Sequence, residues 1–145
     1  MRNNILALDP GKKTGWAAYD FTTKRFVSGE DDFTTSARRV HAIAAELNDE
    51  LSIVSESFTI TVNTAKNTQA TWSLELIGIY RYLSLAYCRE DLTLQAPAAA
   101  KRFSSDDRLR AMGWYTPGKG HANDAARHLM LYLVTRKWWD DRLAV

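Results

Sequence analysis

The fold is decided by residues 5–17, which read Ile5-Leu6-Ala7-Leu8-Asp9-Pro10-Gly11-Lys12-Lys13-Thr14-Gly15-Trp16-Ala17. A nearly continuous apolar run over 4–9 is typical of a strand in the middle of a sheet, buried on both faces. The strand ends in a carboxylate, Asp9, and the Pro-Gly pair after it predicts a tight turn into a second strand. Gly11 and Gly15 flank that turn. They indicate either a close approach of the backbone to another group or a simple hairpin entry.

The rest of the chain alternates between strand and helix patterns. We expect strands over 14–21 and 24–33, a helix over 36–50 with Thr35 as its N-cap, a strand over 52–57, a loop over 58–70, a helix over 71–87, a strand over 92–96, a short helix over 106–112 within an irregular segment 104–120, and a last helix from His121 to about Trp138. Strands that alternate with helices predict an α/β sheet, and the initial hairpin makes that sheet mixed.

The helix over 71–87 is apolar on more than one side. Its apolar positions include Leu74, Leu76, Tyr80, Leu83 and Leu85, which do not form a single stripe. A helix of this kind must bury a second face. It either lies deep in the core or packs on a second subunit.

Length and composition restrict the class of protein. The chain has 145 residues, 46% hydrophobic and 25% charged, which predicts a single soluble domain over 1–145. No apolar run reaches the roughly 18 residues of a membrane span, and the start shows no signal-peptide pattern. Cys88 is the only cysteine, which excludes an internal disulfide and a cysteine-based zinc site. A cytoplasmic setting and no membrane partner are the simplest interpretation.

Three acids lie where a sheet of this kind gathers its functional groups. Asp9 and Glu56 each end a strand, and Asp124 lies near the start of the last helix. If the two strands are parallel neighbours, their carboxylates converge at one edge. Carboxylate oxygens suit hard cations such as Mg²⁺ or Mn²⁺, and two such ions can support phosphodiester hydrolysis. A single acid of this kind is more often a turn or cap residue, but three together favour a site.

Two histidines lie on the same helix face as Asp124. His121 is three residues before it, so the two side chains share a face and His121 could ligate a metal or move a proton. His128 lies one turn further along. A role behind the ligands, or simple surface exposure, is expected for it rather than a direct role.

Basic and aromatic residues near the predicted strand ends suggest a surface for nucleic acid. The net charge is only +2. A basic rim around an acidic centre would nevertheless be formed by Lys12, Lys13, Lys66, Lys101, Arg102 and Lys119. Lys101 could contact the scissile phosphate. Phe58 could stack on an unpaired base or be buried, and the lysines could equally be ordinary loop residues.

These residues resemble the RuvC family of Holliday junction resolvases. The opening strand and turn through Gly15 and the second acid Glu56 match the family pattern. So do three further stretches: Ala65-Lys66-Asn67, Pro97 through Lys101, and Gly120-His121-Ala122-Asn123-Asp124-Ala125-Ala126. The chain departs from the family in its short length, in a longer loop after Glu56 and in His121, which replaces a frequent Asp.

The resemblance implies a fold, an activity and a set of site residues. The fold would be a ribonuclease H-like mixed five-stranded sheet with helices on both faces. The protein would be a homodimer, paired through helix 71–87, that nicks opposing strands of a four-way DNA junction with two Mg²⁺ or Mn²⁺ ions. The products would carry 5′-phosphate and 3′-hydroxyl ends. Asp9, Glu56, His121 and Asp124 would bind the metals, with Lys101 as a further catalytic group. A compact member of this kind suits a phage or mobile element.

Three other functions are compatible with parts of the pattern. The first is a broader branched-DNA or flap endonuclease, or a ribonuclease H-type enzyme that cuts RNA–DNA hybrids. The second is an actin-like ATPase, which shares an opening Asp-x-Gly turn but needs two such domains to enclose a nucleotide. The third is a non-catalytic DNA-binding domain. The clustered acids argue against it, because carboxylates repel one another and DNA unless a cation joins them.

Overall fold

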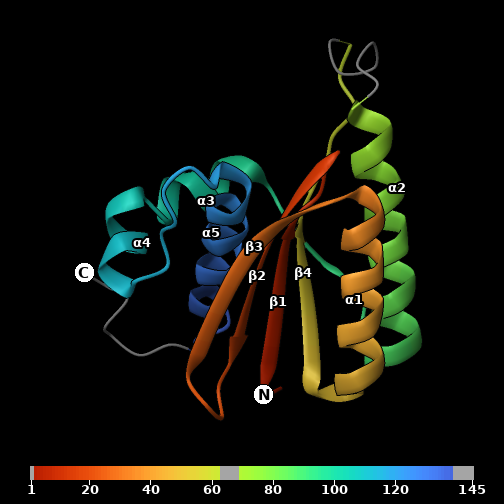
Figure 1. Ribbon diagram of the computed structural model, residues 1–145, viewed down its shortest axis with the longest axis horizontal. Coiled ribbons are helices and arrows are strands. Elements are labelled where there is room, and N and C mark those ends of the chain that lie inside the picture. Colours follow the sequence, from red (N-terminus) through yellow and green to blue (C-terminus); the bar gives the residue numbers. More distant parts are fainter. Residues whose placement is uncertain (1, 63–68, 139–145) are drawn as a thin grey trace.

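The computed structural model describes residues 2–62 and 69–138. A central sheet is flanked by helices on both faces (Figure 1). The elements follow the chain in the order β1 (Asn4–Asp9), β2 (Lys13–Asp20), β3 (Arg25–Asp32), α1 (Phe33–Leu47), η1 (Asn48–Glu50), β4 (Leu51–Glu56), α2 (Gln69–Leu83), η3 (Ser84–Cys88), β5 (Thr93–Gln95), α3 (Pro97–Phe103), α4 (Asp106–Met112) and α5 (Gly120–Thr135).

The sheet has the strand order β3-β2-β1-β4-β5, so β1 is central as its apolar run predicts. β1 pairs antiparallel with β2 and parallel with β4, and β4 pairs parallel with β5. The sheet is therefore mixed and five-stranded, which confirms the predicted fold class. Leu8 lies opposite Ser55 in the β1–β4 ladder, so the next residues, Asp9 and Glu56, end these two strands side by side.

Alternation along the strands divides the core into two halves. On β1, Ile5 and Ala7 pack on the side of α5, whereas Leu6 and Leu8 pack on the side of α1 and α2. Figure 1 shows these helices on opposite faces of the sheet. Side chains two residues apart share a face of a strand. Asp9 therefore faces α5, together with Ile5 and Ala7.

α1 begins earlier than expected. Its N-cap is Asp32, whose carboxylate accepts a hydrogen bond from the Thr35 backbone N–H at 2.8 Å. The prediction that Thr35 is the cap is wrong, because β3 runs directly into the helix and Asp32 already has the extended backbone that a cap needs. The helix ends at Leu47, and Asn48 follows with a positive φ of 52°.

α2 and η3 form the predicted long helix, over 69–88 in place of 71–87. One side lies in the core through Leu76, Tyr80 and Leu83. The other side leaves large apolar groups in solvent, with Tyr82 69% and Leu85 53% exposed. Within the described residues, the second apolar face of this helix is thus not buried by the chain itself.

The C-terminal third differs from the expectation in two places. Residues 97–103 form α3, which was not predicted, although Pro97 at its first turn and the alanines after it are typical of a helix start. α4 lies where it was predicted. α5 ends at Thr135, not Trp138, because Lys137 turns the chain with a positive φ of 57°. No helix within residues 2–62 and 69–138 is long and apolar enough to cross a membrane.

Candidate active site

One row of side chains crosses the sheet on the face that α5 covers. The row consists of Glu30 on β3, Gly15 on β2, Asp9 on β1, Glu56 on β4 and Gln95 on β5. Glu30 lies opposite Gly15, Gly15 opposite Asp9, and Glu56 opposite Gln95. The strand register alone therefore places Asp9 and Glu56 next to each other, as their positions at the ends of parallel strands predict.

The start of α5 lies directly on Gly15. A Cβ added to Gly15 would be 1.8 Å from the His121 carbonyl oxygen and 2.7 Å from the Ala122 nitrogen. No side chain fits in that space, so glycine is required for the close approach that its position in the sequence suggested. The carboxylate of Glu30 accepts hydrogen bonds from the backbone N–H of His121 at 2.8 Å and of Ala122 at 3.3 Å.

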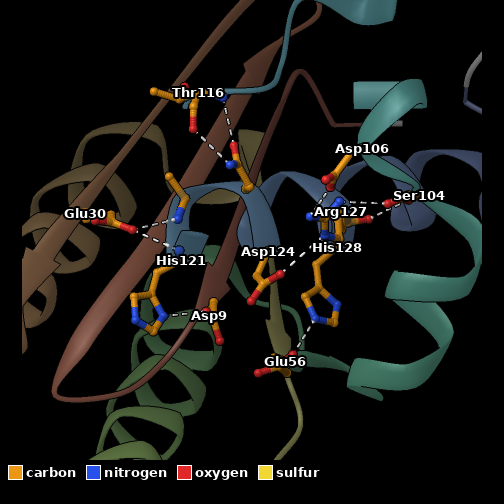
Figure 2. Close-up of polar contacts among 12 residues, drawn as sticks. Asp9, Glu30, Glu56, Ser104, Asp106, Thr116, His121, Asp124, Arg127 and His128 are labelled. Atoms are coloured by element: carbon orange, nitrogen blue, oxygen red, sulfur yellow. Dashed lines mark hydrogen bonds and ion pairs between the residues drawn. The ribbon is translucent and has the colours of Figure 1, made fainter. Parts of the chain in front are cut away.

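Each acid of the site is held by a basic side chain of α5 (Figure 2). The pairs are His121 Nδ1 with Asp9 Oδ2 at 3.1 Å, His128 Nε2 with Glu56 Oε1 at 3.1 Å, and Arg127 Nε with Asp124 Oδ1 at 3.3 Å. Asp124 lies between the other two pairs in Figure 2. The three acids are thus gathered along the first three turns of one helix, which presents a partner to each of them.

Burial and mutual repulsion make Asp9 an unusual carboxyl. Desolvation, the neighbouring Glu56 carboxyl and the charge of Asp124 raise the pKa of Asp9 to about 9, and Lys101 opposes this shift. Burial also acts on Glu56, but hydrogen bonds from His128 and Asp9 outweigh it and lower the pKa of Glu56. The two adjacent acids therefore share one proton, which Asp9 holds.

The donor chemistry of the site suits a divalent cation. Within the described residues, no three His, Cys, Asp or Glu side chains stand close enough together to ligate one ion as they are arranged. Each acid instead contacts its own basic partner on α5. A cation would, however, offset the burial and the repulsion that keep Asp9 protonated, and carboxylate oxygens are ligands that suit Mg²⁺ and Mn²⁺. The residues therefore fit such an ion by the chemistry of their oxygen donors, and not by their present arrangement.

The turn after Asp9 is fixed by contacts from the opposite face of the sheet. Ser73 on α2 donates to the Pro10 carbonyl at 2.9 Å, and the Thr14 hydroxyl donates to the Gly11 carbonyl at 3.2 Å. Ser73 and Thr14 are both buried. The strand end that bears Asp9 is thus held by α2 on one side and by α5 on the other.

The predicted basic and aromatic residues have different outcomes. Lys101 is exposed on α3, and its charge acts on both Asp9 and Glu56, so it lies near the acids. The side chains of Lys12, Lys13, Arg102 and Lys119 are exposed. Lys66 lies outside the described residues. Phe58 is partly buried and packs on the core beneath α1 and α2, so it is not freely exposed for stacking. The role of all of them in DNA binding stays a prediction.

Two residues of the site, Glu30 and Arg127, were not predicted. Glu30 is one of three consecutive acids on β3, and its contact with α5 joins residues 91 apart, so nothing local marks it. The sequence could have predicted the contact of Arg127 with Asp124, because the two residues are three apart and so share a helix face. It also ties α5 to α4, donating to Asp106 at 2.6 Å. His128 is 1% exposed and lies behind Glu56, which agrees with the position expected for it.

Comparison with solved structures identifies the fold. T. thermophilus RuvC, solved in complex with a Holliday junction substrate, superimposes with a TM-score of 0.64 over 93% of this chain and 95% of that chain, at 13% sequence identity. No family model and no curated protein sequence matches the chain. The chain thus has a RuvC-like, ribonuclease H-like fold.

Proposed function

We propose that this chain, as a single nuclease domain over 1–145, is a metal-dependent endodeoxyribonuclease that resolves four-way DNA junctions by paired nicks. The observation that supports this most is the position of Asp9, Glu56 and Asp124. Asp9 and Glu56 end neighbouring strands and Asp124 lies on α5 above them, and burial together with the charges of Glu56 and Asp124 raises the pKa of Asp9. A buried carboxylate beside two others that repel it, as Asp9 is here, is costly to keep unless it serves a bound cation.

Asp9, Glu56, His121 and Asp124 would hold the metal ions. Two bound Mg²⁺ or Mn²⁺ ions would supply an activated water and stabilise the leaving oxygen. The chain's own contribution is to desolvate Asp9, to hold Glu56 by the hydrogen bond to buried His128, and to keep His121 against Asp9. Lys101 would meet the scissile phosphate from α3, where its charge already acts on both acids.

The DNA would lie across the exposed basic residues that border the acids. Lys12 and Lys13 follow the turn after Asp9, Lys119 precedes α5, and Arg102 is next to Lys101. Lysine and arginine side chains neutralise phosphates whatever the sequence, so they would position the junction without selecting bases.

Two copies of the chain would pair through α2, so that two sites face opposing strands. Leu74 and Tyr82 on α2 and Leu85 on η3, which continues it, are exposed. A groove of about 540 Å³ between α1 and α2 is lined by residues that include Phe33, Gly78 and Tyr82. An exposed apolar face of this kind on a helix is typical of a protein interface.

The test is cleavage of a labelled synthetic four-way junction with Mg²⁺, Mn²⁺ or EDTA. A flap, an RNA–DNA hybrid and a linear duplex of the same sequence serve as competing substrates, and Asp9→Asn as the inactive control. We expect paired nicks near the crossover that need the metal, and an Asp9→Asn variant that binds the junction without cutting it. Equal cutting of the flap would indicate a broader branched-DNA nuclease. No cutting by folded protein with either metal would refute the proposal.

A further inference from the structure

We propose that Glu30 is a positioning residue of this site: from β3, it holds the first turn of α5 so that His121 reaches Asp9. The inference concerns the same site as the proposed function and rests on it for the role of the metal. Glu30 is two strands away from Asp9 in the row across the sheet. At about 4.8 Å between strands, it is too far from Asp9 to join a site centred there.

The contact is made with backbone groups that the helix itself leaves unsatisfied. The first N–H groups of any helix have no intrahelical acceptor. At α5 the N-cap position is Lys119, which makes no side-chain capping hydrogen bond among the described residues. The Glu30 carboxylate supplies the acceptor instead, to His121 N at 2.8 Å and Ala122 N at 3.3 Å. A carboxylate at this end of a helix is also favoured by the helix dipole.

The residue that Glu30 holds by its backbone is the one whose ring meets Asp9. His121 Nδ1 lies 3.1 Å from Asp9 Oδ2, although half of the His121 side chain is exposed. An exposed ring has little packing to fix its direction, so its place depends on where its backbone is. Because Gly15 has no side chain, that backbone can lie directly on the sheet, and the hydrogen bond to Glu30 holds it there.

Residues behind metal ligands affect the affinity for the metal. Loss of such a partner typically costs about 10–100-fold in metal affinity or activity. Glu30 acts here on His121 and not on the reacting atoms. The effect of removing it should therefore exceed the effect of losing a helix cap elsewhere, and it should be visible at the His121 ring even without metal.

The experiment compares Glu30→Ala with Glu30→Gln and with a matched cap variant, Asp32→Ala. Asp32 is on the same strand, and its carboxylate caps α1 by accepting from Thr35 N at 2.8 Å. Three quantities are measured on the full chain: the Kd of Mn²⁺ by calorimetry, the ¹⁵N shifts of the His121 ring in metal-free protein, and the Tm. Glu30→Gln keeps an oxygen acceptor in the same place and serves as the conservative variant.

We expect Glu30→Ala to raise the Kd of Mn²⁺ by about tenfold or more and to shift the His121 ring signals from one dominant tautomer to a mixture. Glu30→Gln should keep the Kd of Mn²⁺ and the His121 ring signals close to their wild-type values. Asp32→Ala should change only the Tm. The proposal is overturned if Glu30→Ala lowers the Tm as Asp32→Ala does while the Kd and the ring signals stay at their wild-type values.

Two further outcomes keep the test decisive. If the wild-type protein binds no Mn²⁺, the proposed function fails, and the ring signals alone decide the role of Glu30: a change upholds it and no change overturns it. If Glu30→Ala does not fold, Glu30→Asp replaces it. This variant keeps the charge but shortens the reach of the carboxylate, so the same rise in Kd and the same shift at His121 are expected.

Discussion

Substitution of Gly15 by alanine should displace the start of α5 and weaken the site. The new Cβ would be 1.8 Å from the His121 carbonyl oxygen, whereas ordinary contact begins at 3.4 Å, so the helix start must move by about 1.6 Å, the difference between the two. The three nearest atoms, the carbonyl oxygen and carbon of His121 and the nitrogen of Ala122, all belong to backbone, which cannot rotate away. Overpacking of this kind costs about 1–3 kcal/mol of unfolding free energy.

The displacement acts on the residue that faces Asp9. A misplacement of about 1 Å can cost about 100-fold in rate. We therefore expect Gly15→Ala to reduce junction cleavage by about 100-fold or more and to weaken Mn²⁺ binding. Cleavage is followed in single-turnover assays, metal binding by calorimetry and stability by thermal melting.

Gly120→Ala is the matched control for this change. Gly120 is the first residue of α5, one position before His121, and a Cβ there would meet nothing within 4 Å. This variant should cleave and bind Mn²⁺ as the wild-type protein does. The reasoning is refuted if Gly15→Ala has the cleavage rate, the Mn²⁺ affinity and the Tm of Gly120→Ala, because the backbone of α5 then does not lie on Gly15.

Three further predictions concern the acids and the exposed helix. Burial and Glu56 raise the pKa of Asp9 to about 9, so its contribution to the stability of metal-free protein is fully present below about pH 4 and is lost as the pH rises toward 9. Melting in EDTA should therefore show a Tm that falls between pH 5 and pH 9. Asp9→Asn should flatten that fall and should have a free energy of unfolding at least about 1 kcal/mol higher than the wild-type protein at pH 8. His128→Ala leaves Glu56 without its buried partner and should lower kcat about 10–100-fold at unchanged KM for the junction, in steady-state cleavage assays. Tyr82→Asp places a charge on the exposed face of α2 and should shift the protein from dimer to monomer in light scattering.

Each of these has a contrary result. A Tm that rises from pH 5 to pH 9 in EDTA would mean that Asp9 is not held protonated by its surroundings. A His128→Ala variant that changes KM and not kcat would place His128 in DNA binding. If the wild-type protein is a monomer in light scattering, the proposed dimer is wrong, and the geometry proposed for paired nicks is wrong with it.

The central part of the fold was predictable because its signals are local. The apolar run over 4–9 identified the central strand, and the acid at its end could be placed beside Glu56 once parallel pairing was assumed. The errors lie at element boundaries, where neighbouring residues compete. Thr35 and Asp32 are both good caps, and the extended backbone that continues from β3 favours Asp32. α3 was missed, although Pro97 and the alanines after it indicated a helix start.

The site was predictable to the extent that its residues follow strand ends and helix spacing. Asp124, His121 and His128 share a face of α5, and their spacing of three and four residues along a predicted helix indicated this. Glu30 could not be found in this way, because its contact with His121 depends on the pairing of three strands and on where α5 docks. The role of Gly15 has the same origin. Its sequence position suggested a close approach, but the group that approaches comes from a helix that starts more than 100 residues later.

The central claim is that the carboxylates on the α5 face of the sheet hold divalent cations. The most direct measurement is an anomalous difference map from crystals soaked in MnCl₂. The account predicts Mn²⁺ peaks bounded by Asp9, Glu56 and Asp124, with His121 as a ligand, and no such peaks in crystals of Asp9→Asn. Peaks elsewhere on the surface, or none at a concentration that supports cleavage, would contradict it.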